Sequence, residues 1–251
     1  MPGKIVCYDN EWIDYFHSVE YRVDGASIAA KYGAKAMLVR SIASDSVSSV
    51  HTGYMEYDPK YPKIPCAAIT VEDAEMFSRM QNRGQTIKVR LLLENQFIKN
   101  SYSNNIIFEI KGAEFPDQVV LAGGHIDTWD TGSQTGANDD GGGFITVFEA
   151  FRLLLKNGYR PKRTMRFIAW SGEESGSERD GAAQYFERHK NEMNNHIAAF
   201  ESDLGSTNLL GFSHQGTGQA IVKEVLSKYM SILKADQFDD VVFMADVEPL
   251  G

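Results

Sequence analysis

Histidine and carboxylate side chains recur in the second half of the chain at positions that suit metal binding. They lie in four short segments: His125-x-Asp127, Asn138-Asp139-Asp140-Gly, Glu173-Glu174 and Glu201-Ser-Asp203. A neutral imidazole combined with carboxylates is a ligand set typical of zinc. Each segment alone has an ordinary structural explanation, such as a solvated turn or a helix cap. Their recurrence in the order strand, acid, helix favours a shared site.

Apolar runs directly before three of these segments predict the strands that position them. Val119–Leu121 precedes His125, Arg163–Trp170 precedes Glu173, and Asn195–Phe200 precedes Glu201. In α/β sheets, ligands bind beyond the carboxyl ends of the strands. We therefore expect the three clusters to meet at one edge of a sheet.

Helices are predicted between these strands. After the glycines at positions 141–143, apolar residues recur at helical spacing until Gly158, and a further helix is expected near Gly181. Ile106–Lys111 reads as one more strand, followed by a turn at 114–117. Leu209–Ser213 is a weaker strand candidate, before a helix through Ile221 and Tyr229.

The first hundred residues show alternating short strands and helices without a cluster of possible ligands. Strands are predicted at 4–8, 36–39, 67–69 and 86–93, and helices at 27–32 and 71–80. This part reads as a scaffold or a substrate-access module. The polar stretch 95–105 reads as a linker.

Composition excludes several classes of partner. The formal net charge of −9 over 251 residues argues against nucleic acid and against an anionic membrane surface. No apolar run reaches the roughly 20 residues that a membrane-spanning helix needs. Cys7 and Cys66 are too few for a disulfide framework. They could pair with each other, but isolated buried free thiols are expected. No signal-peptide pattern follows Met1.

The ordered motif set resembles that of the M28 family of zinc-dependent exopeptidases, and the likeness covers essentially the whole chain. The resemblance implies an α/β fold in two parts. Residues 1–98 would be a protease-associated (PA-like) domain, N-terminally incomplete. Residues 99–251 would be the peptidase domain, C-terminally incomplete, with a mixed central sheet flanked by helices.

The resemblance also implies a role for each candidate residue. His125 and Asp203 would bind one zinc ion, Glu174 the other, and Asp139 would bridge the two. Glu173 matches the catalytic base, and Asp127 the carboxylate that orients His125. Paired metals of this kind activate a water molecule. The expected substrates are dipeptides or short peptides, cleaved by a carboxypeptidase or dipeptidase type of activity.

Two departures from the family pattern are apparent. The family's last metal ligand, a C-terminal histidine, has no counterpart after Asp203, since His214 lies too early. We therefore expect the second zinc site to lack one ligand and the activity of a truncated chain to be impaired. The family is secreted or lysosomal, whereas no signal peptide is present here, and the resemblance permits a homodimer.

Two other functions stay open on the sequence. A dizinc deacylase or glutaminyl cyclase would share the fold but not the PA-like part. An inactive fragment or isoform would act, if at all, by binding.

Overall fold

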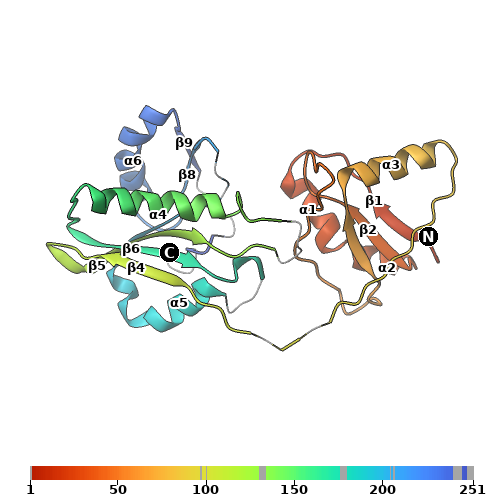
Figure 1. The fold of residues 1–251 in the computed structure, drawn as a ribbon, viewed down its shortest axis with the longest axis horizontal. Helices are drawn as coiled ribbons and strands as arrows, with labels where there is room; N and C mark the ends of the chain where they lie inside the picture. Colours follow the sequence, from red (N-terminus) through yellow and green to blue (C-terminus); the bar gives the residue numbers. More distant parts are fainter. Residues whose placement is uncertain are drawn as a thin grey trace. The chain divides into compact units, whose positions relative to one another are not determined.

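The computed structural model describes residues 2–96, 98–99, 101–129, 134–175, 180–203, 205, 207–239 and 245–247. The chain divides into two units (Figure 1). The first contains Met1–Ser101 with Trp129–Thr135, and the second contains Tyr102–Thr128 with Gly136–Gly251. Every candidate site residue belongs to the second unit.

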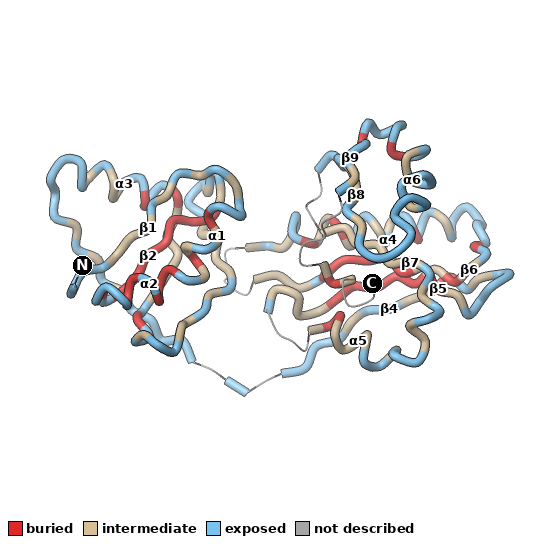
Figure 2. Tube along the Cα trace, turned by 180° about the vertical axis from the view of Figure 1, so that it is seen from behind, coloured by how far each residue is buried: buried red, intermediate tan, exposed pale blue. Residues whose placement is uncertain are grey.

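A three-stranded parallel sheet forms the centre of the first unit, in the order β1 (Ile5–Tyr8), β2 (Ala36–Arg40), β3 (Cys66–Ile69). All five residues of the central strand β2 are buried, as a strand covered on both faces requires (Figure 2). Cys7 and Cys66 lie on the two outer strands and are both free, which confirms the expected free thiols.

Three helices accompany this sheet: α1 (Tyr15–Val23), α2 (Gly25–Lys31) and α3 (Val71–Asn82). Ala26, Ala29 and Ala30 of α2 pack with Met37 and Val39 of β2 in the core of the unit. Small side chains on α2 allow the helix to approach the sheet closely.

The predicted strand at 86–93 is wrong. Its alternating pattern is visible, because Ile87, Val89 and Leu91 are less exposed than their neighbours. No strand forms there, since no described segment pairs with this one. A strand needs the backbone hydrogen bonds of a neighbour as well as an alternating pattern.

The second unit is built on a mixed four-stranded sheet in the order β4-β6-β5-β7. The strands are β4 (Ile106–Ile110), β5 (Phe115–His125), β6 (Arg163–Trp170) and β7 (His196–Glu201). β5 is parallel to both β6 and β7, whereas β4 is antiparallel to β6. The mixed central sheet is thus confirmed. The turn predicted at 114–117 is partly wrong, because β5 already begins at Phe115, before a register shift.

Helices cover both faces of this sheet (Figure 1). On one face, Phe151 of α4 (Gly141–Lys156) packs with Ile110, Phe167 and Ala169. On the other, Ala182 and Tyr185 of α5 (Gly181–His189) pack with apolar side chains of β5 and β6, namely Val119, Leu121, Ile168 and Trp170. Alternate residues of β6 therefore enter two different cores, as the two-residue period of a strand dictates.

Five shorter or later elements complete the description. They are the 3-10 helices η1 (Glu173–Ser175) and η2 (Lys190–Asn195), and the α6 helix (Gln219–Leu233) beside the parallel pair β8 (Gly211–Ser213) and β9 (Gln237–Asp239). In the part of the chain that the structure describes, no helix is long and apolar enough to cross a membrane.

Candidate metal centre

The carboxyl ends of β5, β6 and β7 deliver the candidate residues. His125 is the last residue of β5 and pairs with Trp170 at the end of β6. The sheet contact continues one residue further, because Ile126 donates its N–H to the Trp170 carbonyl at 2.8 Å. β7 ends at Glu201, opposite Gly123 of β5. The polar residues that follow these strands are therefore held at one end of the sheet.

His125 is at the centre of the cluster. Its side chain is 1% exposed, and its Nε2 atom lies 3.1 Å from Asp139 Oδ1, 3.2 Å from Asp203 Oδ1 and 3.8 Å from Glu173 Oε2. Its other ring nitrogen, Nδ1, is 2.9 Å from the backbone carbonyl of Asp127. If that carbonyl accepts the Nδ1 proton, Nε2 is left as the free, ligand-type nitrogen.

The donor atoms fit a metal ion. Atoms of His125, Asp139 and Glu174 all lie within 4.8 Å of one another. Glu174 Oε1 and Asp203 Oδ1 are buried oxygens without a hydrogen-bond partner. Buried polar atoms are normally paired, so unpaired oxygens around an imidazole indicate a site shaped for a cation.

Burial and crowded negative charge shift the pKa values of His125, Glu173 and Glu174. Burial, together with the charge of neighbouring carboxylates, raises the pKa of Glu173 to about 7 and that of Glu174 to about 8. Burial opposes the charged form of His125, yet the hydrogen bond to Asp139 and the negative charges of Asp203 and Glu173 raise its pKa to about 12. A bound cation would stabilise the ionised carboxylates that repel one another here.

The Asp127 carboxylate makes contacts that the sequence did not predict. It accepts backbone N–H groups from Gly172 at 2.8 Å and from Glu173 and Glu174 at 3.2 Å. Its own Oδ1 is 3.8 Å from His125 Nδ1, an ion-pair distance. The hydrogen bond to the imidazole runs to the Asp127 carbonyl instead.

Asp140 is a further acidic residue at the site to which the sequence assigned no role. Its carboxyl is fully buried and neither oxygen has a hydrogen-bond partner. A Cβ atom on Gly124 would lie 2.1 Å from Asp140 Oδ2, and one on Gly143 would lie 2.0 Å from Oδ1. Both glycines are thus needed to accommodate this side chain. Its position inside the Asn138-Asp139-Asp140-Gly motif was the available signal.

Glu201 and Asp246 form a second pair of acids beside the site. Burial raises the pKa of both carboxyls. The charge of Asp246 raises the pKa of Glu201 further, and the charge of Glu173 raises that of Asp246. The Val247 N–H donates to Glu201 Oε2 at 3.2 Å, which ties the segment 245–247 to the end of β7. Glu201 was visible in the Glu201-Ser-Asp203 motif. Asp246 had no sequence signal, because it lies in a stretch that reads as an ordinary loop.

The structure therefore brings together all six residues singled out from the sequence: His125, Asp127, Asp139, Glu173, Glu174 and Asp203. His214 follows β8, where its backbone N–H bonds to Asp239 at 3.0 Å. It does not belong to the group of possible ligands found among the described residues.

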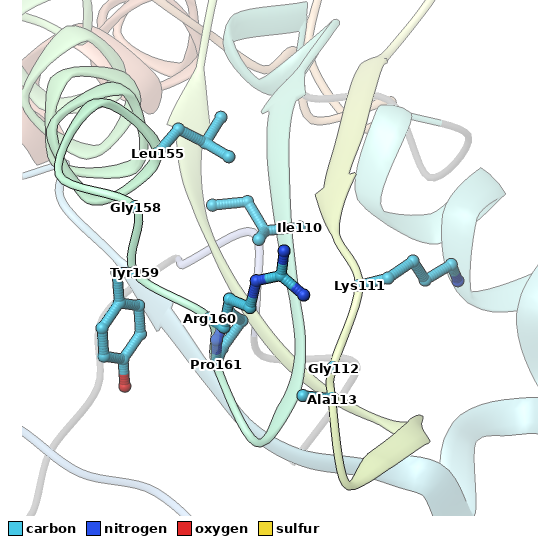
Figure 3. A pocket seen from close by; sticks show the side chains of 9 residues that line it. All are labelled: Ile110, Lys111, Gly112, Ala113, Leu155, Gly158, Tyr159, Arg160 and Pro161. Carbon is cyan, nitrogen blue, oxygen red and sulfur yellow. The ribbon is translucent and has the colours of Figure 1, made fainter.

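A separate cavity of about 400 Å³ lies at the other end of β6, lined by residues 110–113, Leu155 and 158–161 (Figure 3). Pro161 precedes the first residue of β6, whereas Glu173 and Glu174 follow its last. The cavity is lined by two basic residues, Lys111 and Arg160, and by no acid or histidine. The candidate ligands therefore lie at the opposite end of β6 from this cavity.

Comparison with known proteins agrees with the geometry. The sequence model of peptidase family M28 matches residues 105–247. The chain is similar to carboxypeptidase Q of Bos taurus, with 44% identity over 96% of this chain and 52% of the relative. For carboxypeptidase Q of Homo sapiens the identity is 46%, over 92% of this chain and 48% of the relative.

A solved structure of a peptidase M28 precursor from Shewanella amazonensis is also similar. The two structures superpose with a TM-score of 0.81 at 29% sequence identity. The match covers 98% of this chain and 56% of the Shewanella amazonensis chain. This chain spans about half the length of the curated relatives it matches.

Proposed function

Because the chain belongs to peptidase family M28, we propose that it is the metal-binding part of a zinc-dependent exopeptidase that hydrolyses dipeptides or short peptides. The convergence of His125, Asp139 and Glu174 supports this proposal more than any other observation. The carboxypeptidase Q relatives favour a carboxypeptidase type of exopeptidase.

The donor set combines a buried imidazole with carboxylates, and this combination favours zinc. His125 and Asp203 would hold one ion, Glu174 a second, and Asp139 would contribute to both. The short distances from His125 Nε2 to Asp139 and Asp203 support the first assignment. When bound, zinc supplies Lewis-acid activation of water and of the peptide carbonyl.

Glu173 is the proposed general base. Its Oε2 lies 3.8 Å from His125 Nε2, farther than the Asp139 and Asp203 oxygens at 3.1 and 3.2 Å, yet next to the proposed ligand atoms. A pKa raised to about 7 by burial suits a group that accepts a proton and later returns it near neutral pH. Glu173 would take the proton of the attacking water and pass it to the leaving amine.

We also propose where the whole protein acts, how it assembles and what its first domain is. The family resemblance implies a secreted or lysosomal enzyme and is compatible with a homodimer. We propose the PA-like assignment for residues 1–98 on the same ground. A small peptide is the partner that the acidic, histidine-containing site favours.

Zinc content and peptide hydrolysis, measured on the purified chain, test the proposed function. We expect the chain to retain zinc after dialysis and to lose it on His125→Ala or Asp139→Asn. Asp14→Asn, at the N-cap of α1, is the control and should keep the metal. Hydrolytic activity is measured on a panel of dipeptides, through the free amine that cleavage releases. A chain that retains no zinc and cleaves no dipeptide would act, if at all, by binding, and the proposed function would be lost.

A further inference from the structure

Asp127 contacts two elements of the site, one through its backbone carbonyl and the other through its side-chain carboxylate. Its backbone carbonyl is 2.9 Å from Nδ1 of His125, at the end of β5. Its side chain accepts three successive backbone N–H groups, from Gly172, Glu173 and Glu174, at the start of η1. Consecutive amides that point at one carboxylate form an anion-binding concavity.

The local conformation after β6 allows this arrangement. Gly172 has φ +90°, in the left-handed region that favours glycine. The turn directs the N–H groups of positions 172 to 174 toward one point, which the Asp127 carboxylate occupies. The two glutamates at positions 173 and 174 then leave the same short turn with fixed starting directions.

We propose that Asp127 is a positioning residue for Glu173 and Glu174: its carboxylate fixes the turn that carries both glutamates, while its backbone carbonyl orients His125. The proposal deepens the proposed function and rests on it for its catalytic consequence. It assigns the carboxylate a different role from the one the family resemblance implied, which was to orient the imidazole.

Distances favour this division of labour. The carboxylate is 3.8 Å from His125 Nδ1 but 2.8 Å from the Gly172 nitrogen. Removing the carboxylate would leave three N–H groups without their acceptor, while the carbonyl contact of His125 would persist. A displacement of about 1 Å in a catalytic group costs roughly 100-fold in rate.

Amide hydrogen exchange on the metal-free chain tests the positioning role directly. For Asp127→Ala we expect exchange at Gly172, Glu173 and Glu174 to accelerate at least about tenfold, since each amide loses a hydrogen bond to a charged acceptor. The nitrogen NMR shifts of the His125 ring should stay unchanged. Asp14→Ala is the matched control, because Asp14 also accepts a backbone N–H, from His17 at 2.9 Å. It should leave the 172–174 amides unaffected.

Asp127→Asn is a milder variant that guards against misfolding. Its remaining oxygen can replace Oδ1, which serves Gly172 and Glu173, but its amide group cannot accept from Glu174. Faster exchange confined to Glu174 is the expected result. Altered His125 ring shifts with unchanged exchange at 172–174, in either variant, would overturn the proposal.

Kinetics add a second readout that separates this inference from the proposed function. In zinc-loaded protein, Asp127→Asn should lower kcat with little change in KM, because the turn holds groups that act on the reacting water. If the exchange result is obtained but no variant of the protein hydrolyses peptides, the positioning role stands and the proposed function fails. If hydrolysis is present and the exchange is unchanged, the positioning role fails alone.

Discussion

Glu173 and Glu174 are adjacent in the sequence but face different neighbours. Glu173 Oε2 lies near His125 Nε2, at 3.8 Å, whereas Glu174 belongs to the group of atoms that could hold a metal. Glu174 Oε1 is buried without a hydrogen-bond partner, as expected for an atom reserved for an ion. At the scale of single residues, two chemically identical side chains therefore have different surroundings, as the proposed division into base and ligand requires.

This division predicts different outcomes for the same substitution. Glu173→Gln should keep zinc but lose roughly 100-fold to 10,000-fold in kcat, because an amide cannot accept the water's proton. Glu174→Gln should instead weaken zinc binding, since a neutral amide oxygen replaces a charged ligand. Zinc titration and dipeptide turnover on both variants measure the two effects. Equal loss of metal in the two variants would contradict the assignment.

At the scale of elements, close packing of α4 against the backbone after β7 holds the segment that carries Asp139 in place. A Cβ atom on Gly143 would lie 1.8 Å from the Ser202 carbonyl oxygen and 2.0 Å from Asp140 Oδ1. The first turn of α4 therefore approaches the backbone after β7 more closely than any side chain allows. Asp139 lies shortly before Gly143 in the sequence, and Asp203 directly follows Ser202, so both candidate ligands are next to this contact.

Gly143→Ala should accordingly destabilise the second unit by at least about 3 kcal/mol, the upper end of typical overpacking costs, because the obstructing atom is backbone. Zinc binding should weaken with it. Glu149→Ala, on an exposed part of α4, is the control and should leave the stability almost unchanged. Urea unfolding measures both. An unchanged midpoint for Gly143→Ala would show that α4 can shift without cost.

A second contact between elements predicts a pH dependence in the first unit. The Glu72 carboxylate, in the first turn of α3, accepts the Ser46 hydroxyl and the Ser48 N–H, the latter at 2.9 Å. These hydrogen bonds lower the pKa of Glu72 to about 2. The contact therefore stabilises the fold above the ordinary glutamate pKa, and this contribution is lost as the pH falls toward about 2.

Glu72→Gln should lower the thermal midpoint of the first unit at pH 7 and have a smaller effect near pH 2, where about half of the wild-type carboxyl is protonated. The measurement is thermal unfolding at both pH values. Glu75→Gln, on the same helix in an exposed pair with Arg79, is the matched control. A Glu72→Gln effect of equal size at both pH values would contradict the role of the charge.

At the scale of the whole molecule, the two units have separate cores. The apolar cluster around Met37 and Val39 is confined to the first unit, whereas those around Leu121 and Phe167 are confined to the second. All candidate ligands belong to the second unit. Ligand binding stabilises only the cooperative unit that contains the site.

We therefore expect zinc at 100 times its dissociation constant to stabilise the second unit by about 2.7 kcal/mol and to leave the first unchanged. Hydrogen exchange with and without zinc resolves the two units. Residues 1–98 prepared alone should unfold cooperatively and show no response to zinc, and Asp139→Asn should abolish the response of the whole chain. Zinc protection spread equally over both units would show that they unfold together.

The order of motifs along the chain was sufficient to predict the site's members. Val119–Leu121 and Arg163–Trp170 are apolar runs with polar ends, and strand geometry alone places such ends at one edge of a sheet. The predicted strand at 86–93 shows the limit of this reasoning. Its alternation is real, but hydrogen-bond pairing depends on a neighbour that the local sequence does not specify.

The sequence by itself thus determined which side chains meet at this end of the sheet: His125, Asp139, Glu174 and the acids around them are visible from residue type and strand-ending position. Only the tertiary structure decided how they are held. The turn after β6 folds over Asp127, so its carboxylate binds backbone amides and its carbonyl contacts the imidazole. Asp246 reaches the site from a distant loop. Such contacts depend on distances between segments far apart in the chain, which no local pattern encodes.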